Sequence, residues 1–462
     1  MRQDTSTPGT GEVLEVWFED RLVGRIERLS ESVVDIGFSY DPAWTEYSDA
    51  FPISLLMPLS RLRHEPSVAY PWFLNLLPEG GALQTVGNLL KVNELDVFGM
   101  LAEMGRDLPG ALDIRPAEPQ GVAMRPRYRP LADNELADAI RRLPERPLLV
   151  GEDGVHMSVA GAQEKLPVVR YKDGKIGLAL DGAPSTHIIK PRNTKFQTSV
   201  ENEAFCLRLA TAAKMNAVHV SVHLLEDIEY LLVERYDRRI EGGRVRRLHQ
   251  EDLCQATGFP PSLKYEWNQQ VQTRGPGLQT CMEALAKTGA PALNKLRFFE
   301  YMLFNVLVGN VDAHAKNYSL LIELGGNVSM APIYDVMNGD IYQNVTRNLA
   351  MKVAMKQRGG HIYGRHWKRF AEDNSLSANL VLRRVAFLSR AVLAAVPGVV
   401  NEMENSALSS RVSGEIGNYV SDYCRRMLSN LESDPRPDEN NQDSQLPEDD
   451  DAANRTPLTI SP

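Results

Sequence analysis

Residues 309–317, GNVDAHAKN, place an aspartate, a histidine, a lysine and an asparagine directly after an apolar segment. Phosphoryl transfer from ATP needs a carboxylate near the attacking hydroxyl, oxygen ligands for magnesium and a cation for the phosphates. Asp312 and Asn317 are five positions apart. This is the spacing of the catalytic aspartate and the metal-binding asparagine in the catalytic loop of protein kinases. The spacing predicts that Asp312 accepts a proton from a hydroxyl and that Asn317 offers its amide oxygen to a metal.

Three charged residues outside this loop fit the same chemistry. Asp335 ends the stretch 318–335, which is typical of a strand, a Gly-Gly-Asn turn and a second strand. The second metal-binding aspartate of kinases has this place, but here the triplet is D-V-M and not D-F-G, which disfavours an ordinary eukaryotic kinase. Lys190 ends the apolar strand THIIKP, where a phosphate-pairing lysine would lie, and Glu203 on the next predicted helix is its candidate partner.

Two further segments could hold a nucleotide. SVAGAQEKLPVV (158–169) is a turn of small residues that leads into a strand and could direct backbone N–H groups at phosphates. It is not a Walker loop, because the G-x-x-x-x-G-K-[ST] spacing is absent. VERYD (233–237) ends a strand where two lobes would join, so backbone groups of Glu234 and Tyr236 could contact the adenine edge.

Each of these residues also has a structural interpretation when it is taken alone. Asp312 and Ser158 could cap a turn or helix, and His314 could be a buried structural histidine. Lys190 could be solvated at a strand end, and Glu203 could be a charge at a helix N-terminus. Their order favours the catalytic interpretation, since a loop, strand lysine, helix, hinge, catalytic loop, hairpin and aspartate follow one another as in a kinase.

The elements that would position these residues form a regular order. Residues 13–39 indicate a β-hairpin, residues 150–237 are rich in predicted strands, and the chain beyond 249 is mostly helical. The helix before the catalytic loop is predicted from apolar residues three and four positions apart. The fold class that follows is α+β, a bilobed protein-kinase-like fold with a β-rich N-lobe, an added N-terminal subdomain and a helical C-lobe. The predicted boundaries are a disordered lead-in at 1–12, an N-terminal subdomain at 13–115, a Pro- and Arg-rich linker at 116–149, the β-rich lobe at 150–237, the helical lobe at 238–432 and an acidic disordered tail at 433–462.

Composition limits the function classes. The chain has 462 residues, of which 43% are hydrophobic and 24% charged, as in a globular protein of two or three domains. No apolar run is long enough to span a membrane, and the N-terminus has no export signal, so we expect a cytoplasmic protein with no membrane partner. The four cysteines are scattered, which indicates neither disulfides nor zinc. A net charge of −9 argues against direct binding of nucleic acid by the whole chain.

The sequence resembles a known family of kinases. SVAGAQEK, APSTHIIKP, VERYDRR, HQEDLCQATG, PSLKYE, VDAHAKN and PIYDV are similar to motifs of the HipA toxin kinases, and NLLPEG with FGMLAEMGRDLPGAL is similar to the N-terminal subdomain of that family. The resemblance covers roughly residues 13–430. The first residues and the acidic tail are extra relative to the family.

The resemblance implies a role for each matching position. ATP and Mg²⁺ would be the cofactors, Asp312 the catalytic base, and Asn317 and Asp335 the metal ligands. Ser158 would be an autophosphorylation site that switches the enzyme off, because about two negative charges beside the ATP loop would repel the nucleotide phosphates. The residues expected to bind the nucleotide are Ala160, Gly161, Ala162, Gln163, Glu164, Lys165, Lys190, Glu234, Arg235, Tyr236, His314, Ala315, Lys316, Asn317, Tyr334 and Asp335.

The resemblance also implies partners. A HipA-like serine/threonine kinase would be the toxin of a type II toxin–antitoxin module, acting on a protein serine, with a tRNA-charging enzyme such as glutamyl-tRNA synthetase as the first candidate, and causing growth arrest and persistence. A HipB-like helix-turn-helix antitoxin would bind it, and operator DNA would be contacted only through that complex, with repression of the operon. Residues 351–371 hold six Lys or Arg and no acid, so they could touch DNA phosphates or form a solvated face of the helical lobe. The alternatives are a kinase of this fold that acts on a small molecule, and a mainly DNA-repressing scaffold.

Overall fold

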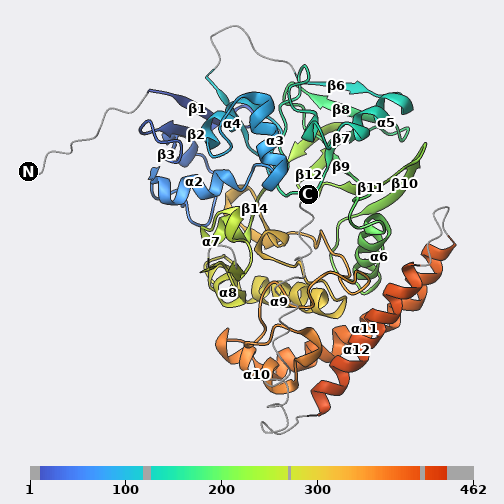
Figure 1. Cartoon of the computed structure of the whole chain (residues 1–462). Helices are drawn as coiled ribbons and strands as arrows, with labels where there is room; N and C mark the ends of the chain where they lie inside the picture. Colours follow the sequence, from blue (N-terminus) through green and yellow to red (C-terminus); the bar gives the residue numbers. More distant parts are fainter. Residues whose placement is uncertain (1–10, 118–125, 269–271, 406–411, 434–462) are drawn as a thin grey trace, which may run out of the picture.

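The computed structural model describes residues 11–117, 126–268, 272–405 and 412–433 of the chain. Figure 1 shows the N-terminal elements in blue beside a green strand-rich region, with yellow, orange and red helices below them. The chain therefore has the predicted mixed fold, in which a strand-rich lobe and a helical lobe are joined to a further N-terminal unit. The predicted lead-in and acidic tail lie almost entirely outside the described residues.

The N-terminal unit is built on an antiparallel sheet of five strands in the order β4-β3-β2-β1-β5. Its first two strands pair as the predicted hairpin, with alternate residues of β1 buried because one face of the sheet carries the core. The strands are β1 (Val13–Phe18), β2 (Arg21–Arg28), β3 (Ile36–Tyr40), β4 (Arg63–His64) and β5 (Asp113–Pro116), and the helices are α1 (Pro42–Thr45), α2 (Pro66–Leu74), α3 (Gly80–Leu90) and α4 (Val97–Met104).

The strand-rich lobe contains a six-stranded antiparallel sheet in the order β10-β11-β9-β7-β8-β6. Five of its six strands come from residues 150–237, which the sequence predicts to be rich in strands. The strands are β6 (Arg127–Pro130), β7 (Leu166–Arg170), β8 (Ile176–Leu180), β9 (His187–Pro191), β10 (Val220–Leu225) and β11 (Ile228–Glu234). Helix α6 (Ser199–Ala212) packs against β10 and β11 and carries Glu203.

The predicted linker at 116–149 differs from the structure. Its described part contains β6, which pairs with β8 at the edge of the sheet, followed by α5 (Asp133–Arg141) and the 3₁₀ helix η1 (Pro147–Leu149). All four β6 residues are exposed, because the strand lies at the edge of the sheet. An edge strand tolerates proline and charge, so this segment has the composition of a linker although it is part of the lobe.

The helical lobe contains a three-stranded antiparallel sheet in the order β14-β17-β18. The hairpin predicted at 318–335 is formed by β17 (Ser319–Ile322) and β18 (Val328–Met330), and β14 (His249–Asp252) adds a strand that the sequence did not indicate. The remaining elements of the lobe are the strands β12 (Arg238–Glu241), β13 (Arg244–Arg247), β15 (Trp267–Asn268) and β16 (Thr273–Arg274), the 3₁₀ helices η2 (Pro261–Leu263), η3 (Ala315–Asn317), η4 (Leu324–Gly326) and η5 (Gly359–His361), and the helices α7 (Leu253–Thr257), α8 (Leu278–Leu285), α9 (Pro291–Leu307), α10 (Gly364–Asp373), α11 (Ala378–Glu404) and α12 (Val412–Glu432).

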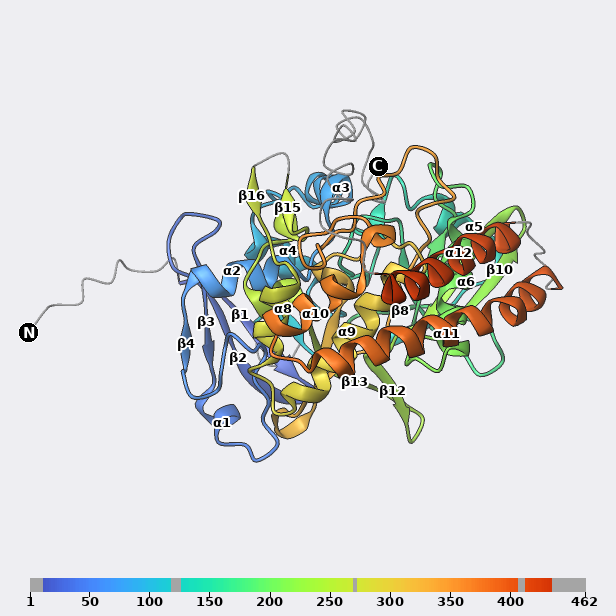
Figure 2. The same cartoon turned by 90° about the horizontal axis from the view of Figure 1, so that it is seen from below.

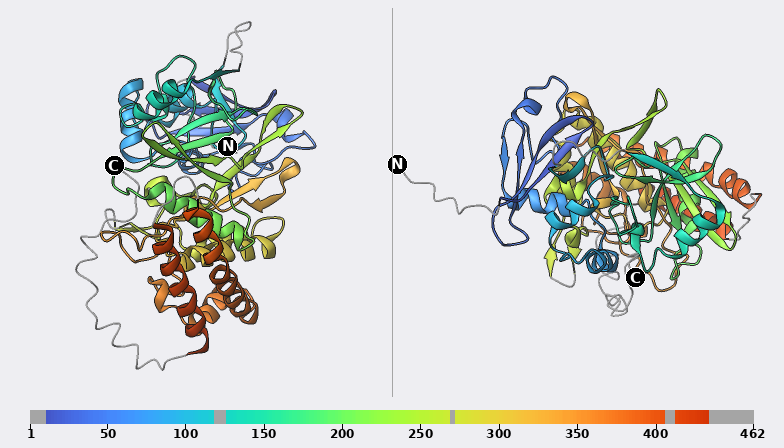
Figure 3. Two further views of the ribbon diagram at one scale, coloured as in Figure 1. Left: turned by 90° about the vertical axis from the view of Figure 1, so that its right-hand side faces the viewer. Right: turned by 90° about the horizontal axis from the view of Figure 1, so that it is seen from above.

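Helix α9 runs through the helical lobe and ends just before the loop that holds Asp312 and Asn317. Its Phe299, Leu303 and Val306 are buried, as the apolar spacing predicts. The long helices α11 and α12 lie side by side along the outside of the lobe in Figure 2, and α11 also packs against α6. Figure 3 shows the strand-rich lobe stacked on the helical lobe, with the N-terminal unit beside the strand-rich lobe. None of the helices in the described ranges is both long and apolar enough for a bilayer crossing.

Candidate active site

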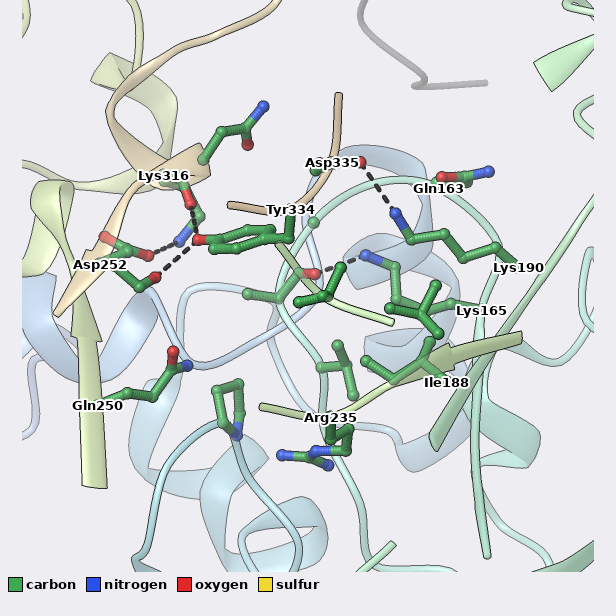
Figure 4. Close-up of a pocket in the computed structure, with 18 of the residues that line it drawn as sticks. Gln163, Lys165, Ile188, Lys190, Arg235, Gln250, Asp252, Lys316, Tyr334 and Asp335 are labelled. Atoms are coloured by element: carbon green, nitrogen blue, oxygen red, sulfur yellow. Dashed lines mark hydrogen bonds and ion pairs between the residues drawn. The ribbon is translucent and has the colours of Figure 1, made fainter. Parts of the chain in front are cut away.

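One cavity lies between the two lobes and receives residues from all three parts of the chain. It is lined by the turn after α2, the loop before β7, the strands β9 and β11, the loop after α9 and the segment after β18 (Figure 4). Asp312, Asn317 and Asp335, which are far apart in the sequence, all line it. Of the sixteen residues expected to bind the nucleotide, the structure brings fourteen to this cavity and leaves Glu164 and Ala315 out of its wall, and Ser158 also lies outside it.

Lys190, on β9, is held between two carboxylates. Its Nζ atom donates to Oε1 of Glu203 at 2.7 Å and to Oδ1 of Asp335 at 2.9 Å, and the second contact is drawn in Figure 4. Burial opposes its charge, but the two carboxylates outweigh this effect and raise the pKa of Lys190. The predicted pairing with Glu203 is thus present, and the lysine is a fixed cation at the cavity.

Asp335 follows β18 in a left-handed backbone conformation with φ of 57°. Aspartate is among the few residues besides glycine that adopt this region without large strain. Burial would raise the pKa of its carboxyl, but Lys190 and Lys165 outweigh burial and lower it to about 2. Asp335 is therefore ionised at neutral pH, which is the form of a carboxyl that can bind a metal.

Asp312 lies in a different electrostatic environment. Burial raises the pKa of its carboxyl to about 7, although the positive charge of Lys264 and a hydrogen bond from Tyr265 oppose the rise. The Tyr265 hydroxyl donates to Oδ1 of Asp312 at 2.5 Å. A carboxylate with a pKa near the working pH is suited to take a proton from a hydroxyl.

The loop after Asp312 is folded back on that residue. The His314 N–H donates to the Asp312 carbonyl at 2.7 Å, and Nδ2 of Asn317 donates to the same carbonyl at 3.0 Å. Since the Asn317 amide nitrogen is used in this way, its side-chain oxygen is the atom left for a metal. Burial lowers the pKa of His314 well below its usual value, so the imidazole is neutral, and its Nδ1 is buried without a hydrogen-bond partner among the described residues.

The loop before β7 points a lysine into the cavity. Nζ of Lys165 donates to the Ala160 carbonyl at 2.6 Å (Figure 4). Burial, and then repulsion by Lys190, lower the pKa of Lys165 to about 8. Gly161 has a φ of 102°, and a Cβ there would lie 2.7 Å from Nζ of Lys165, so only glycine fits this turn.

Ser158 is fully buried beneath the same loop. Its hydroxyl donates to the carbonyl of Leu76 at 2.7 Å, and its N–H donates to the carbonyl of Asp107 at 3.1 Å. Both acceptors belong to the N-terminal unit. A phosphate cannot be added to this hydroxyl unless the loop first leaves its place.

The segment after β11 has two different roles. Glu234, Arg235 and Tyr236 line the cavity, and the Tyr236 ring stacks on Tyr334 with ring centroids 5.5 Å apart. Within the described part of the chain, the Tyr236 N–H has no backbone partner, whereas the Arg235 N–H donates to Thr186. Among the N–H groups of Glu234, Arg235 and Tyr236, that of Tyr236 is thus the one left available to a ligand.

The Arg235 side chain has a structural role in this conformation. Its guanidinium is buried, donates to both carboxylate oxygens of Asp237 at 3.0 and 2.8 Å, and lies 3.5 Å from a carboxylate oxygen of Asp107. Asp107 belongs to the N-terminal unit, so this cluster joins that unit to the strand-rich lobe. Lys316 is also committed, because its Nζ donates to Asp252 at 2.7 Å. These two cations stabilise the walls of the cavity.

Five residues in or beside the wall of the cavity were given no role from the sequence. Asn75, Glu79, Asp252 and Lys264 line the cavity, and Tyr265 contacts Asp312. The motifs NLLPEG and PSLKYE contain four of the five. The signal was therefore present as a resemblance, but no spacing within either motif indicates that the two meet.

The oxygen atoms at the cavity suit a magnesium ion bound together with a nucleotide better than a metal ion whose ligands all come from protein. No group of three or more His, Cys, Asp or Glu able to hold a metal is found among the residues that the structure describes. The cavity instead offers an ionised carboxylate at Asp335 and an amide oxygen at Asn317. Magnesium typically takes one or two carboxylates from protein and the rest of its ligands from phosphates and water.

Comparison with known families identifies the chain. The HipA N-terminal domain matches residues 14–115, and the HipA-like C-terminal domain matches residues 157–400, which is over half of the chain. The chain belongs to the HipA family.

Relatives within the HipA family cover nearly the whole chain. A protein of Sinorhizobium fredii named as an unconfirmed kinase, Y4mE, is 34% identical over 87% of this chain and 95% of its own length. The serine/threonine-protein kinase toxin HipA of Shewanella oneidensis is 29% identical over 84% of this chain and 89% of its own. A solved complex of HipA, HipB and operator DNA from Shewanella oneidensis matches with a TM-score of 0.75 and 27% identity, covering 90% of this chain and 96% of that chain. The kinase-like fold predicted from the sequence is thus confirmed.

Proposed function

We propose that this HipA-family chain is an ATP-dependent serine/threonine protein kinase and the toxin of a type II toxin–antitoxin module. The observation that carries the proposal is the meeting of Asp312, Asn317, Asp335 and Lys190 at one cavity between two lobes. The kinase name of the Shewanella relative supports the same activity.

In the proposed mechanism, a carboxylate accepts the proton and two lysines bind the phosphates. Asp312 accepts the proton of the attacking hydroxyl, because its raised pKa makes it a better base than a solvent-exposed aspartate. Lys190 and Lys165 would provide positive charge for the phosphates, and backbone N–H groups of residues 160–163 would contact them. Tyr236 offers its N–H to the adenine edge, and its ring stacks on Tyr334. These groups bind and orient the reactants, which is most of what phosphoryl transfer requires.

Magnesium and ATP are the proposed cofactors. When bound, MgATP would supply the transferred phosphoryl group and neutralise its charge. Asn317 and Asp335 would hold the metal. Glu203, which lies 2.7 Å from Nζ of Lys190, would keep the lysine in place if Asp335 turned to the metal.

The proposed partners follow from the Shewanella complex, which contains HipB and operator DNA. A HipB-like helix-turn-helix antitoxin would bind this chain, and DNA would be reached through that complex. Lys368 and Arg369 lie on the exposed face of α10, while Trp367 and Phe370 pack inward. The two exposed cations are the candidates for contacts with DNA phosphates. The two buried aromatic residues attach the helix to the lobe.

The finer proposals concern substrate and control. The substrate would be a serine of a protein, with a tRNA-charging enzyme such as glutamyl-tRNA synthetase tested first, and its modification would arrest growth and favour persistence in the cytoplasm. Self-phosphorylation at Ser158 would inactivate the enzyme, because a charged group cannot return to the buried site beneath the loop.

The experiment compares wild-type protein with Asp312→Asn in cells and in solution. We expect Asp312→Asn to bind MgATP within about twofold of wild type and to transfer phosphate at least about 10²-fold more slowly. The exposed Asp373→Asn serves as the matched control. Phosphoproteomes of cells expressing each variant would identify the substrate. Growth arrest by Asp312→Asn equal to that of wild type would contradict the proposal, and a labelled metabolite in place of a labelled protein would favour the small-molecule alternative.

A further inference from the structure

The turn between α2 and α3, residues 75–79, contacts the loop that precedes β7. The Ser158 hydroxyl donates to the Leu76 carbonyl at 2.7 Å, and the Glu79 N–H donates to the Gly161 carbonyl at 3.2 Å. We call residues 75–79 the bridging turn. Through the backbone groups of Leu76 and Glu79, it holds the loop before β7 (residues 158–165) at two points.

The bridging turn also contacts the helical lobe. Nζ of Lys316 donates to Oδ1 of Asn75 at 2.7 Å, and Nζ of Lys264 donates to Oε2 of Glu79 at 2.8 Å. The Lys264 carbonyl in turn accepts the N–H of Ala315 at 3.2 Å. Two lysines beside the catalytic loop are therefore held by one turn of the N-terminal unit.

The contact of Glu79 with Lys264 leads directly to the catalytic aspartate. Lys264 precedes Tyr265, and the Tyr265 hydroxyl donates to Oδ1 of Asp312 at 2.5 Å. The Tyr265 ring also meets the His314 ring edge-on, with centroids 5.0 Å apart. A shift of Lys264 would move Tyr265 and so change where the Asp312 carboxylate points.

The burial of the Glu79 carboxylate is explained by its contact with Lys264. It is the N-cap residue of α3, yet its side chain makes no capping hydrogen bond. It is buried at the cavity wall with 9% of its surface exposed, and its Oε1 has no partner among the described residues. Burying a carboxylate costs free energy, whereas a capping residue exposed to solvent has no such cost. Among the residues that the structure describes, its ion pair is with Lys264, and this interaction therefore accounts for its position.

We infer that Glu79 is a positioning residue for phosphoryl transfer, which the N-terminal unit supplies to hold Lys264 and Tyr265 against Asp312. This inference rests on the proposed kinase function. It adds that the two lobes alone do not complete the catalytic site, because the N-terminal unit holds the catalytic loop in its working geometry.

The first test uses the full-length protein without nucleotide. Hydrogen exchange of the peptide that contains residues 310–318 is measured in wild type, Glu79→Gln and Glu79→Asp. We expect about tenfold faster exchange in Glu79→Gln and partial recovery in Glu79→Asp, which keeps the charge. The control is Glu65→Gln, which removes an exposed glutamate at the N-cap of α2 and should leave exchange unchanged.

The second test is kinetic. We expect Glu79→Gln to lower the rate of phosphate transfer about 10²-fold with MgATP affinity within about twofold, because the backbone contact of Glu79 with Gly161 is retained. Lys264→Met should give a similar loss, and the double variant should be no slower than the slower single variant. Fold-changes that multiply in the double variant would show independent action and overturn the inference.

The remaining outcomes are also decisive. Should Glu79→Gln fail to fold because Lys264 is left buried and unpaired, the double variant Glu79→Gln/Lys264→Met, which leaves neither charge, carries both tests. If wild type transfers no phosphate, the proposed function fails, while the exchange measurement still decides whether Glu79 holds the loop. Exchange and transfer at wild-type rates in Glu79→Gln would overturn the inference and leave the proposed function intact.

Discussion

The Nζ atom of Lys190 lies 2.9 Å from Oδ1 of Asp335, although the two residues are 145 positions apart in the sequence. The lysine comes from the strand-rich lobe and the aspartate from the helical lobe. Their ion pair joins the two lobes at the cavity between them. It also keeps in place the two groups that would meet the phosphates and the metal.

Replacing Lys190 with methionine should affect both binding and stability. The change leaves the buried Glu203 without its cation, so we expect a loss of about 3 kcal/mol in the free energy of unfolding. MgATP affinity should fall at least about tenfold. Calorimetric titration and urea unfolding measure the two effects. Lys175→Met, at an exposed turn, is the control and should change neither.

The pH dependence of transfer should report Asp312. Its carboxyl has a pKa of about 7, so the ionised form that accepts a proton is lost as the pH falls through 7. The rate should therefore fall about tenfold per pH unit below that point. Lys264→Met removes a charge that lowers this pKa, so its acidic limb should move to higher pH. An acidic limb near pH 4 in wild type would contradict the assignment of Asp312 as the base.

Glu251 predicts a pH dependence of stability that is separate from catalysis. Burial raises the pKa of this carboxyl to about 7, although hydrogen bonds from Leu55 and Trp72 oppose the rise. Between about pH 4.5 and 7 the unfolded chain is ionised while the folded chain keeps its proton, so stability falls as the pH rises. Urea unfolding at pH 5 and pH 8 should differ less in Glu251→Gln than in wild type. Equal differences in the two proteins would refute the prediction.

Ser158→Ala should separate self-labelling from activity. The change removes one buried hydrogen bond to Leu76, which we expect to cost about 1 kcal/mol without moving the loop. Phosphate transfer to a protein substrate should persist, and mass spectrometry should find no phosphate on the loop. Ser158→Asp, which places a charge in the buried site, should instead lower MgATP affinity. Self-phosphorylation at another residue of wild type, with none at Ser158, would count against the switch.

Arg235→Met tests the structural role of that side chain. The change leaves Asp107 and Asp237 buried with one cation fewer, so we expect the free energy of unfolding to drop by about 3 kcal/mol or more. MgATP affinity of the folded protein should stay within about twofold, since the hinge amide belongs to Tyr236. A selective loss of nucleotide binding at unchanged stability would instead give the guanidinium a direct role in the site.

The sequence was most informative where chemistry and spacing coincide in one short segment. Asp312 and Asn317 lie on the same loop because α9 ends just before it, and apolar spacing alone predicts that helix. The hairpin that follows brings Asp335 to the cavity, and its Gly-Gly-Asn turn made the hairpin predictable from the sequence. The pairing of Lys190 with Glu203 was also predictable, since a strand and the next helix commonly pack together.

Other features could not be predicted because their partners are remote. Glu79 and Lys264 are 185 positions apart, and nothing near either residue indicates their contact. Arginine side chains are usually solvated. The burial of Arg235 is explained only by its contact with Asp107, which belongs to another unit. Strand β6 was hidden for a different reason, because an edge strand leaves its side chains in solvent and so shows no apolar alternation.

The bridging turn forms part of the wall of the cavity between the lobes, which affects how a selective inhibitor of this site could be designed. A compound that extends from the adenine position to Asn75 and Glu79 would meet an amide and a carboxylate from outside the two lobes. A kinase made of two lobes alone presents no such groups. Selectivity for this family could therefore be designed on that side of the cavity, where the target would also lose the contact that orders its catalytic loop.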